Sequence, residues 1–146
     1  MTTIVRRTET LRDYAACVVI RYRVFVLSQD VPEGLEIDGN EDTSVHYLAL
    51  NGDAPVGTAR YRVLGGDTGK IERMAVLPEH QGSGVGTALV RRVVDDLKAL
   101  GTVVTIRAGA QTHALPFYER FGFEAAGPEY LDAGILHRDI FMKISD

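Results

Sequence analysis

The most regular pattern in the chain lies between residues 85 and 100, where apolar side chains recur at helical spacing. The apolar stripe consists of Gly86, Leu89, Val90, Val93, Val94, Leu97 and Leu100. Charged residues occupy the opposite side, which is typical of a helix that packs one face against a core. Gly101 follows as a C-terminal cap. A second helix is predicted from Leu11 to Val26, with Thr10 as its N-terminal cap.

Alternating and β-branched runs predict strands around these helices. They fall at residues 2–9, 45–50, 55–64, 70–77 and 102–106, with two closing strands near 124–127 and 137–144. The 102–106 strand is expected beside the 70–77 strand. A hairpin at Asn51-Gly52 and a short helix from Thr112 to Phe121 complete the order. We expect one domain over residues 1–146, of the α/β (α+β) class, with helices flanking a mixed, mostly antiparallel sheet.

A loop with three alternating glycines, Gly82, Gly84 and Gly86, joins the 70–77 strand to the main helix. Glycines let a ligand approach the backbone closely, and a helix start offers unpaired N–H groups and a positive dipole end. An anion is therefore expected here. Gly86 is followed by Thr87 without a lysine, so a P-loop does not fit. The glycine spacing also differs from that of a dinucleotide fingerprint.

Composition narrows the kind of protein. The chain has 146 residues, of which 45% are hydrophobic and 25% charged, as in a soluble single domain. A net charge of −4 argues against binding to nucleic acid or to an anionic membrane. The N-terminus lacks a signal-peptide core and no run could span a membrane, so a cytoplasmic location is expected. A single cysteine, Cys17, and four histidines without ligand spacing predict no metal.

Two motifs carry a resemblance to a known family. Gln81-x-x-Gly84-x-Gly86 stands between a strand and an amphipathic helix, and Ala114-x-x-Phe117-Tyr118-x-x-x-Gly122-Phe123 follows a later strand. Together they resemble the GNAT superfamily of acyl-CoA-dependent N-acyltransferases, over nearly the whole chain and in the family's element order. The run from Arg23 to Pro32, followed by Glu36-Ile37-Asp38, also resembles the small ElaA-like bacterial branch.

The resemblance implies transfer of an acetyl group from acetyl-CoA (coenzyme A) directly to a primary amine of a small molecule or peptide. Backbone N–H groups of residues 81–87 would hold the coenzyme pyrophosphate, and the main chains of Met74 and Val76 would pair with the pantetheine and the thioester. The implied cofactor residues are Met74, Ala75, Val76, Gln81, Gly82, Ser83, Gly84, Val85, Gly86, Thr87, Gln111 and Tyr118. At residue 111 the family usually has asparagine. A homodimer through sheet edges or the last strands is also consistent with the resemblance.

Tyr118 is the expected proton donor to the departing thiolate. Its alternative reading is a core aromatic beside Phe117 and Phe121. Glu72 is the expected base for the amine, because strand alternation puts it on the same face as Met74. The alternative for Glu72 is a cross-strand ion pair with Arg60 or Arg62.

The segment from 28 to 44 contains six acidic residues and no lysine or arginine. It is either a solvated loop or an acidic wall that attracts a cationic acceptor. After Glu72, four further candidates for the base could line the acceptor side: Glu36, Asp38, His46 and His137. The first three of these are also the expected acceptor-binding residues. His113 is expected to be structural.

Two other functions remain open from the sequence. A non-catalytic acyl-CoA-binding or sensor module would bind the coenzyme without turnover. A nucleotide-binding regulatory domain would bind ATP or NAD instead of coenzyme A.

Overall fold

The computed structural model describes residues 2–31, 39–40 and 43–144. The elements in chain order are β1 (Thr3–Arg7), α1 (Leu11–Arg21), the π-helix η1 (Tyr22–Ser28), β2 (Val45–Asn51), β3 (Ala54–Leu64), β4 (Thr68–Val76), the 3₁₀-helix η3 (Pro78–His80), α3 (Val85–Ala99), β5 (Thr105–Gln111), the 3₁₀-helix η4 (Thr112–Ala114), α4 (Leu115–Glu119), β6 (Glu124–Asp132) and β7 (Ile135–Lys143).

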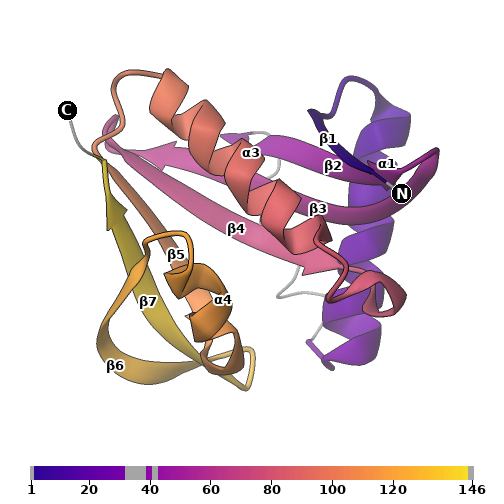
Figure 1. Cartoon of the computed structure of the whole chain (residues 1–146). Helices are drawn as coiled ribbons and strands as arrows, with labels where there is room; N and C mark the ends of the chain where they lie inside the picture. Colours follow the sequence, from indigo (N-terminus) through magenta and orange to yellow (C-terminus); the bar gives the residue numbers. More distant parts are fainter. Residues whose placement is uncertain (1, 32–38, 41–42, 145–146) are drawn as a thin grey trace.

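The strands form one seven-stranded sheet in the order β1-β2-β3-β4-β5-β7-β6 (Figure 1). All neighbouring pairs are antiparallel except β4 and β5, which run parallel. The fold is therefore the predicted mixed, mostly antiparallel sheet flanked by helices. β5 also lies beside β4, as predicted.

β4 and β5 pair along only part of their length. Residues Thr68–Ile71 of β4 pair with Thr105–Ala108 of β5, and the two strands then point apart (Figure 1). Beyond these pairs, the described part of β5 offers β4 no further strand partner. The facing backbone edges of the two strands are left open where they separate, and this opening is where a ligand can reach main-chain donors and acceptors.

The helices cover the two faces of the sheet unequally. α3 contributes Leu89, Val93 and Leu97 to the larger core, between the sheet and the helix. Gly57 and Gly69 allow this close contact, since a side chain there would come within 2.9 Å of Val85 and 2.7 Å of Leu97.

α1 lies on the opposite face. It packs Cys17 and Ile20 against Leu48, Ala75 and Leu77 in a second, smaller core. In the described residues, no helix is long and apolar enough to cross a membrane.

Three predicted elements differ in detail. The helix predicted from Leu11 to Val26 becomes a π-helix at Tyr22, and it continues to Ser28. The fifth strand begins at Thr105 and runs to Gln111, because Gly101 and the residues after it form the connection from α3. The Thr112 hydroxyl does not cap α4; it donates to Glu129 at 3.1 Å.

A bulge in β4 changes which side chains share a face. The register passes from Thr58–Ala75 to Arg60–Glu72, so β4 has one more residue than β3 in this interval. Arg73 lies there with a φ of 53°, in the left-handed region. Ile71, Met74 and Val76 therefore share the α3 face.

The bulge corrects a prediction made from ideal strand alternation. Glu72 does not share a face with Met74; it lies with Arg60 and Arg62 on the side that α1 covers in part. The extra residue shifts the alternation by one position, which a pattern of polar and apolar residues does not reveal.

Candidate functional site

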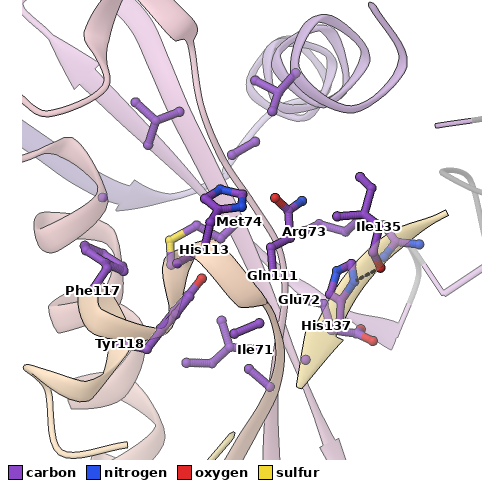
Figure 2. Close-up of a pocket in the computed structure, with 18 of the residues that line it drawn as sticks. Ile71, Glu72, Arg73, Met74, Gln111, His113, Phe117, Tyr118, Ile135 and His137 are labelled. Atoms are coloured by element: carbon purple, nitrogen blue, oxygen red, sulfur yellow. Dashed lines mark hydrogen bonds between the residues drawn. The ribbon is translucent and has the colours of Figure 1, made fainter. Parts of the chain in front are cut away.

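A cavity of about 830 Å³ lies where β4 and β5 separate. It is bounded by the loop before α3, by the open stretch of β4, by β5 with η4 and α4, and by residues of β6, β7 and η1. Figure 2 draws 18 of the lining residues and labels ten of them. Its volume is in the range of sites for small molecules and cofactors.

The start of α3 forms one end of the cavity. Gly84 is the N-cap residue with a φ of 92°, and no side chain of the described residues caps the helix. Gly82 has a φ of 79°, and a Cβ at either glycine would meet nothing within 4 Å. The first N–H groups of α3 are therefore free of intrahelical and side-chain partners, at the positive end of the helix dipole. This arrangement suits a phosphate or pyrophosphate group.

The loop before α3 is braced by its own side chains. The Gln81 amide donates to the Val76 carbonyl oxygen at 3.1 Å, and the Ser83 hydroxyl donates to the His80 carbonyl oxygen. Five of the residues that the resemblance assigns to the coenzyme line the cavity: Gln81, Gly82, Gly84, Gly86 and Thr87. The side chains of the other two predicted residues do not: Ser83 is turned to His80, and Val85 is 1% exposed in the core.

β4 supplies the middle of the cavity. Met74, Ala75 and Val76 line it, at the part of the strand that lacks a β5 partner. Met74 and Val76 also pack on the main core, so the strand is held in place while its open edge faces the cavity. Backbone groups on such an edge can bind an extended ligand in the manner of an added strand.

Tyr118 lies on α4 at the wall of the cavity. Its ring packs edge-on against Phe117 and Phe123, at centroid distances of 5.0 and 6.0 Å. Burial raises the pKa of the phenol to about 12, so it stays protonated at neutral pH. The ring therefore packs as a core aromatic, which was the alternative role for Tyr118. Its hydroxyl has no hydrogen-bond partner within the part of the chain that the structure describes.

Phe117 brings α4 to the start of α3. A Cβ on Gly86 would come within 3.3 Å of the Phe117 ring. The glycine thus lets α4 approach closely, and the wall that carries Tyr118 meets the loop that carries the free N–H groups. This contact joins the two motifs found in the sequence into one site.

Glu72 lies at the centre of an ion cluster. Its carboxylate contacts Arg60 at 3.1 Å, Arg62 at 2.8 Å and Lys70 at 3.1 Å. Burial alone would raise the pKa of Glu72, but the hydrogen bond from Arg62 and the charges of Arg60 and Lys70 outweigh it and lower the pKa to about 2. The predicted ion pair is present. A carboxylate of such low basicity is a poor proton acceptor, so the base role is disfavoured even though Glu72 lines the cavity.

Of the predicted acceptor-binding residues, the structure describes only His46, and it lies away from the cavity. His46 is 7% exposed, packs edge-on against Tyr14 of α1 at 5.0 Å, and is not among the lining residues. Strand alternation in β2 turns it, with Leu48, toward α1. Glu36 and Asp38 lie outside the described residues.

Gln111 lines the cavity, but its amide is already engaged. It donates to the side-chain oxygen of Gln29 at 2.9 Å, which links the end of β5 to the residue after η1. Gln29 and the neighbouring Phe25 line the cavity too. The π-helix, a form often found at functional sites, thus borders this site.

Sequence reasoning missed several other residues of the cavity. Lys70, Arg73, Arg107, Tyr130 and Asp139 line it. Two histidines line the cavity as well. They are His137, a further candidate from the sequence, and His113, which was expected to be structural and is exposed. No motif marks these residues. The strand registers bring them together, since Gln111 pairs with His137, and His137 pairs with Tyr130.

Comparison with known proteins shows the family of the chain. Residues 10–144 match the family model of the GNAT acetyltransferase domain. The chain is 38% identical over 135 residues to the uncharacterized N-acetyltransferase YjcF of Bacillus subtilis, covering 92% of this chain and 93% of YjcF.

Solved structures share the fold. Escherichia coli ElaA superposes with a TM-score of 0.87 at 24% identity, over 97% of this chain and all of that one. An aminoglycoside 6'-N-acetyltransferase complexed with coenzyme A gives a TM-score of 0.76 at 14% identity, over 98% of both chains. The cavity, the two motifs and the family match together lead to one conclusion: the chain belongs to the GNAT acetyltransferase family and is an acyltransferase enzyme.

Proposed function

We propose that the protein transfers an acetyl group from acetyl-CoA directly to a primary amine of a small molecule or peptide. The observation that supports this most is the continuity of one cavity. It runs from the uncapped start of α3, along the open edge of β4, to the phenol of Tyr118. These are the groups needed to bind a pyrophosphate, hold an extended thiol arm and donate a hydrogen bond to sulfur.

The binding of the coenzyme is supported by the fit of the loop. The free N–H groups at residues 85–87 suit the pyrophosphate, and the open space over Gly82 and Gly84 leaves room for it. The coenzyme A complex of a protein of the same fold is a further support. When bound, acetyl-CoA supplies the activated acyl group, and the residues of the chain orient it.

The open edge of β4 is assigned the task of holding the acyl carbonyl. A backbone N–H at Met74 or Val76 would donate to the carbonyl oxygen, on which negative charge develops as the amine attacks. The core packing of both side chains keeps that N–H fixed. A fixed donor requires little rearrangement at the moment of reaction, and one such donor is worth about 10²-fold or more in rate.

Tyr118 is assigned the role of donor to the sulfur. Because its pKa is raised to about 12, the phenol is present as a donor under all ordinary conditions. A thiol has a pKa near 8.5, so complete transfer from this phenol to the thiolate is unfavourable by itself. Transfer becomes favourable when the new amide nitrogen releases a proton that replaces the one given up by Tyr118.

An assay of coenzyme A release with a panel of primary amines tests the proposal. The panel would contain polyamines, amino acids, aminosugars and short peptides, and mass spectrometry would identify a product carrying one added acetyl group. We expect amine-dependent release that forms an amide in equal amount. Tight binding of acetyl-CoA without amine-dependent turnover across the panel would instead favour the non-catalytic binding module.

A further inference from the structure

The cavity has a second side that the proposed function leaves without a chemical role. One face of β5 and β7 carries polar side chains and points away from α4: Arg107, Gln111, His137 and Asp139. The other face carries apolar side chains that belong to the core beneath α3 and α4: Ala108, Ala110 and Ile140. Tyr130 of β6 joins the polar side chains. Figure 2 shows His137 and Tyr118 on opposite sides of Met74 and Gln111. An amine that approaches Met74 from this side meets His137 rather than Tyr118.

An amine acceptor must lose a proton before it can attack. Aliphatic amines have pKa values near 10 and are mostly protonated at neutral pH. The ammonium form has no lone pair, so some group must accept its proton. Glu72 does not fit this role, because three cations hold its carboxylate.

The ring of His137 is held in one orientation and one tautomer. Its Nδ1 lies 2.7 Å from the carbonyl oxygen of Ile135. A carbonyl oxygen only accepts, so Nδ1 carries the hydrogen and donates it, and in the neutral ring Nε2 keeps its lone pair. The ring of Tyr130 stacks on the ring of His137, with the two centroids 5.9 Å apart and the two planes at 22°.

Tyr130 is itself fixed in place. Its hydroxyl donates to Asp139 at 2.7 Å, and it lies above Gly109, where a Cβ would come within 2.6 Å of the phenol oxygen. Gly109 thus leaves the space that lets Tyr130 support the His137 ring. A half-buried imidazole with a fixed lone pair at the wall of a cavity has the features of a proton acceptor.

We propose that His137 Nε2 accepts the proton of the acceptor ammonium, through bridging water, and thereby produces the neutral amine. The inference rests on the proposed function. His137 lies on β7, two strands from β4 in the sheet order. Paired strands are about 4.8 Å apart, and at the level of His137 β4 and β5 no longer pair, so β4 lies further away still. That span exceeds a single hydrogen bond, so water completes the path.

The protons of the whole reaction balance with this assignment. The ammonium gives one proton to His137, and the neutral nitrogen forms a bond to the acyl carbon. The carbon–sulfur bond breaks, Tyr118 protonates the sulfur, and the nitrogen returns its second proton to the phenolate. The products are an amide, a thiol and one proton on His137, which passes to solvent.

Other titratable groups share this part of the cavity and bear on any pH profile. In the described residues they are Lys70, Glu72 and Arg73 of β4, Arg107 of β5, His113 of η4, Tyr130 and Asp132 of β6, and Asp139 of β7. His113 is the one other imidazole among them. His113 lines the cavity from η4, and Figure 2 shows it next to Met74 rather than with His137.

The test compares His137→Asn with His113→Asn in the intact enzyme. An asparagine amide can still donate to Ile135 from the position of Nδ1, but it provides no base. We expect His137→Asn to lower kcat at neutral pH by about 10²-fold. Its KM for acetyl-CoA and its melting temperature should stay close to those of the wild type.

The pH profile separates a proton acceptor from a structural residue. The deficit of His137→Asn should shrink as the pH rises toward the pKa of the acceptor amine, because the amine is then neutral without help. In the wild type we expect kcat to fall at acidic pH, and His113→Asn should keep this acidic limb of the profile.

Two outcomes would overturn the inference while leaving the proposed function standing. One is a His137→Asn enzyme whose deficit is the same at every pH or absent. The other is loss of the acidic limb in His113→Asn instead. A wild-type enzyme that turns over none of the amines would mean failure of the proposed function, and it would be seen before either variant is compared.

Discussion

The hydroxyl of Tyr118 can be removed without disturbing its surroundings. The ring packs against Phe117 and Phe123, while the hydroxyl has no partner among the described residues. Tyr118→Phe should therefore keep the fold and the affinity for acetyl-CoA, and lower kcat by about 10²-fold. Steady-state kinetics together with calorimetric titration of acetyl-CoA measures both quantities.

A matched control is the same change at Tyr22, which is 41% exposed and does not line the cavity. Tyr22→Phe should leave kcat unchanged. Equal kcat in wild type and Tyr118→Phe would remove the phenol from the mechanism.

Glu72 gives a prediction about acid stability. Its pKa falls from an ordinary 4.5 to about 2 in the folded protein, so folding favours the ionised form. The resulting stabilisation is complete above about pH 4.5 and is lost as the pH falls toward 2. For a side chain only 8% exposed, a difference of this size corresponds to roughly 3 kcal/mol. Urea unfolding between pH 2 and 7 should show this loss in the wild type.

In Glu72→Gln that part of the pH dependence should be missing, and the free energy of unfolding at pH 7 should be lower by about 3 kcal/mol. The reason is that Arg60, which is 0% exposed, loses the charge of Glu72 at 3.1 Å. Glu79→Gln is the control, since the Arg23–Glu79 pair is exposed and should contribute less than about 1 kcal/mol. Similar losses in both variants would argue against a stabilising role specific to the buried cluster.

At the scale of single residues, the sequence indicated which residue types are candidates for the site better than it indicated the face on which each side chain lies. Tyr118 and the glycines Gly82, Gly84 and Gly86 belong to motifs, and the structure places them in the lining of one cavity. Glu72 was assigned to a face by counting along an ideal strand, and one extra residue at Arg73 reversed the result. His137 was placed after Glu72 as a candidate for the base, because the features that favour it, a hydrogen bond to Ile135 and a cross-strand neighbour, are set by tertiary contacts.

The two ends of α3 provide a test at the scale of one element. Gly84 at its start and Gly101 after its end both have positive φ, 92° and 76°, and a Cβ at either would meet nothing within 4 Å. Alanine at each position therefore costs only the backbone strain, about 1–2 kcal/mol. Thermal or urea unfolding should show similar losses for Gly84→Ala and Gly101→Ala.

Binding should distinguish the two variants. Gly84→Ala changes the backbone that aims the free N–H groups of residues 85–87, so its Kd for coenzyme A should rise by about tenfold, which corresponds to 1.4 kcal/mol. Gly101→Ala leaves that end of the helix untouched and should bind as the wild type does. Equal affinity in the two variants would contradict a role for the α3 start in holding the coenzyme.

Elements with a regular spacing of apolar residues were predicted well. Elements whose type or length depends on tertiary contacts were not. The stripe of α3 and the hairpin strands follow from local patterns. The change from α1 to a π-helix at Tyr22 adds no sequence signal, because the same apolar spacing fits both forms. β5 extends to Gln111 because β7 pairs with it there, and that pairing is not local.

On the scale of the molecule, the site depends on a sheet that separates between two parallel strands. α3 and its core support β4, while α4 and Phe123 support the other side through Tyr118. The cavity is thus bounded by two parts of the sheet whose described strands pair only between Thr68–Ile71 and Thr105–Ala108, and which also meet where Phe117 packs on Gly86. A ligand that fills the cavity contacts both parts and should strengthen the connection between them.

This gives a prediction for the stability of the whole protein. A ligand that binds only the folded state stabilises it by about 2.7 kcal/mol when present at 100 times its Kd. In a domain of about this size, that corresponds to a rise in melting temperature of roughly 5–10 °C. Coenzyme A and acetyl-CoA should both produce it in a thermal-shift assay, because the pyrophosphate and the pantetheine arm are common to both. ATP and NAD lack that arm and should give little or no shift, since the open edge of β4 would stay without a partner. An equal rise with ATP or NAD would mean that the start of α3 recognises phosphate alone, and that the separation of β4 and β5 has no part in choosing the ligand.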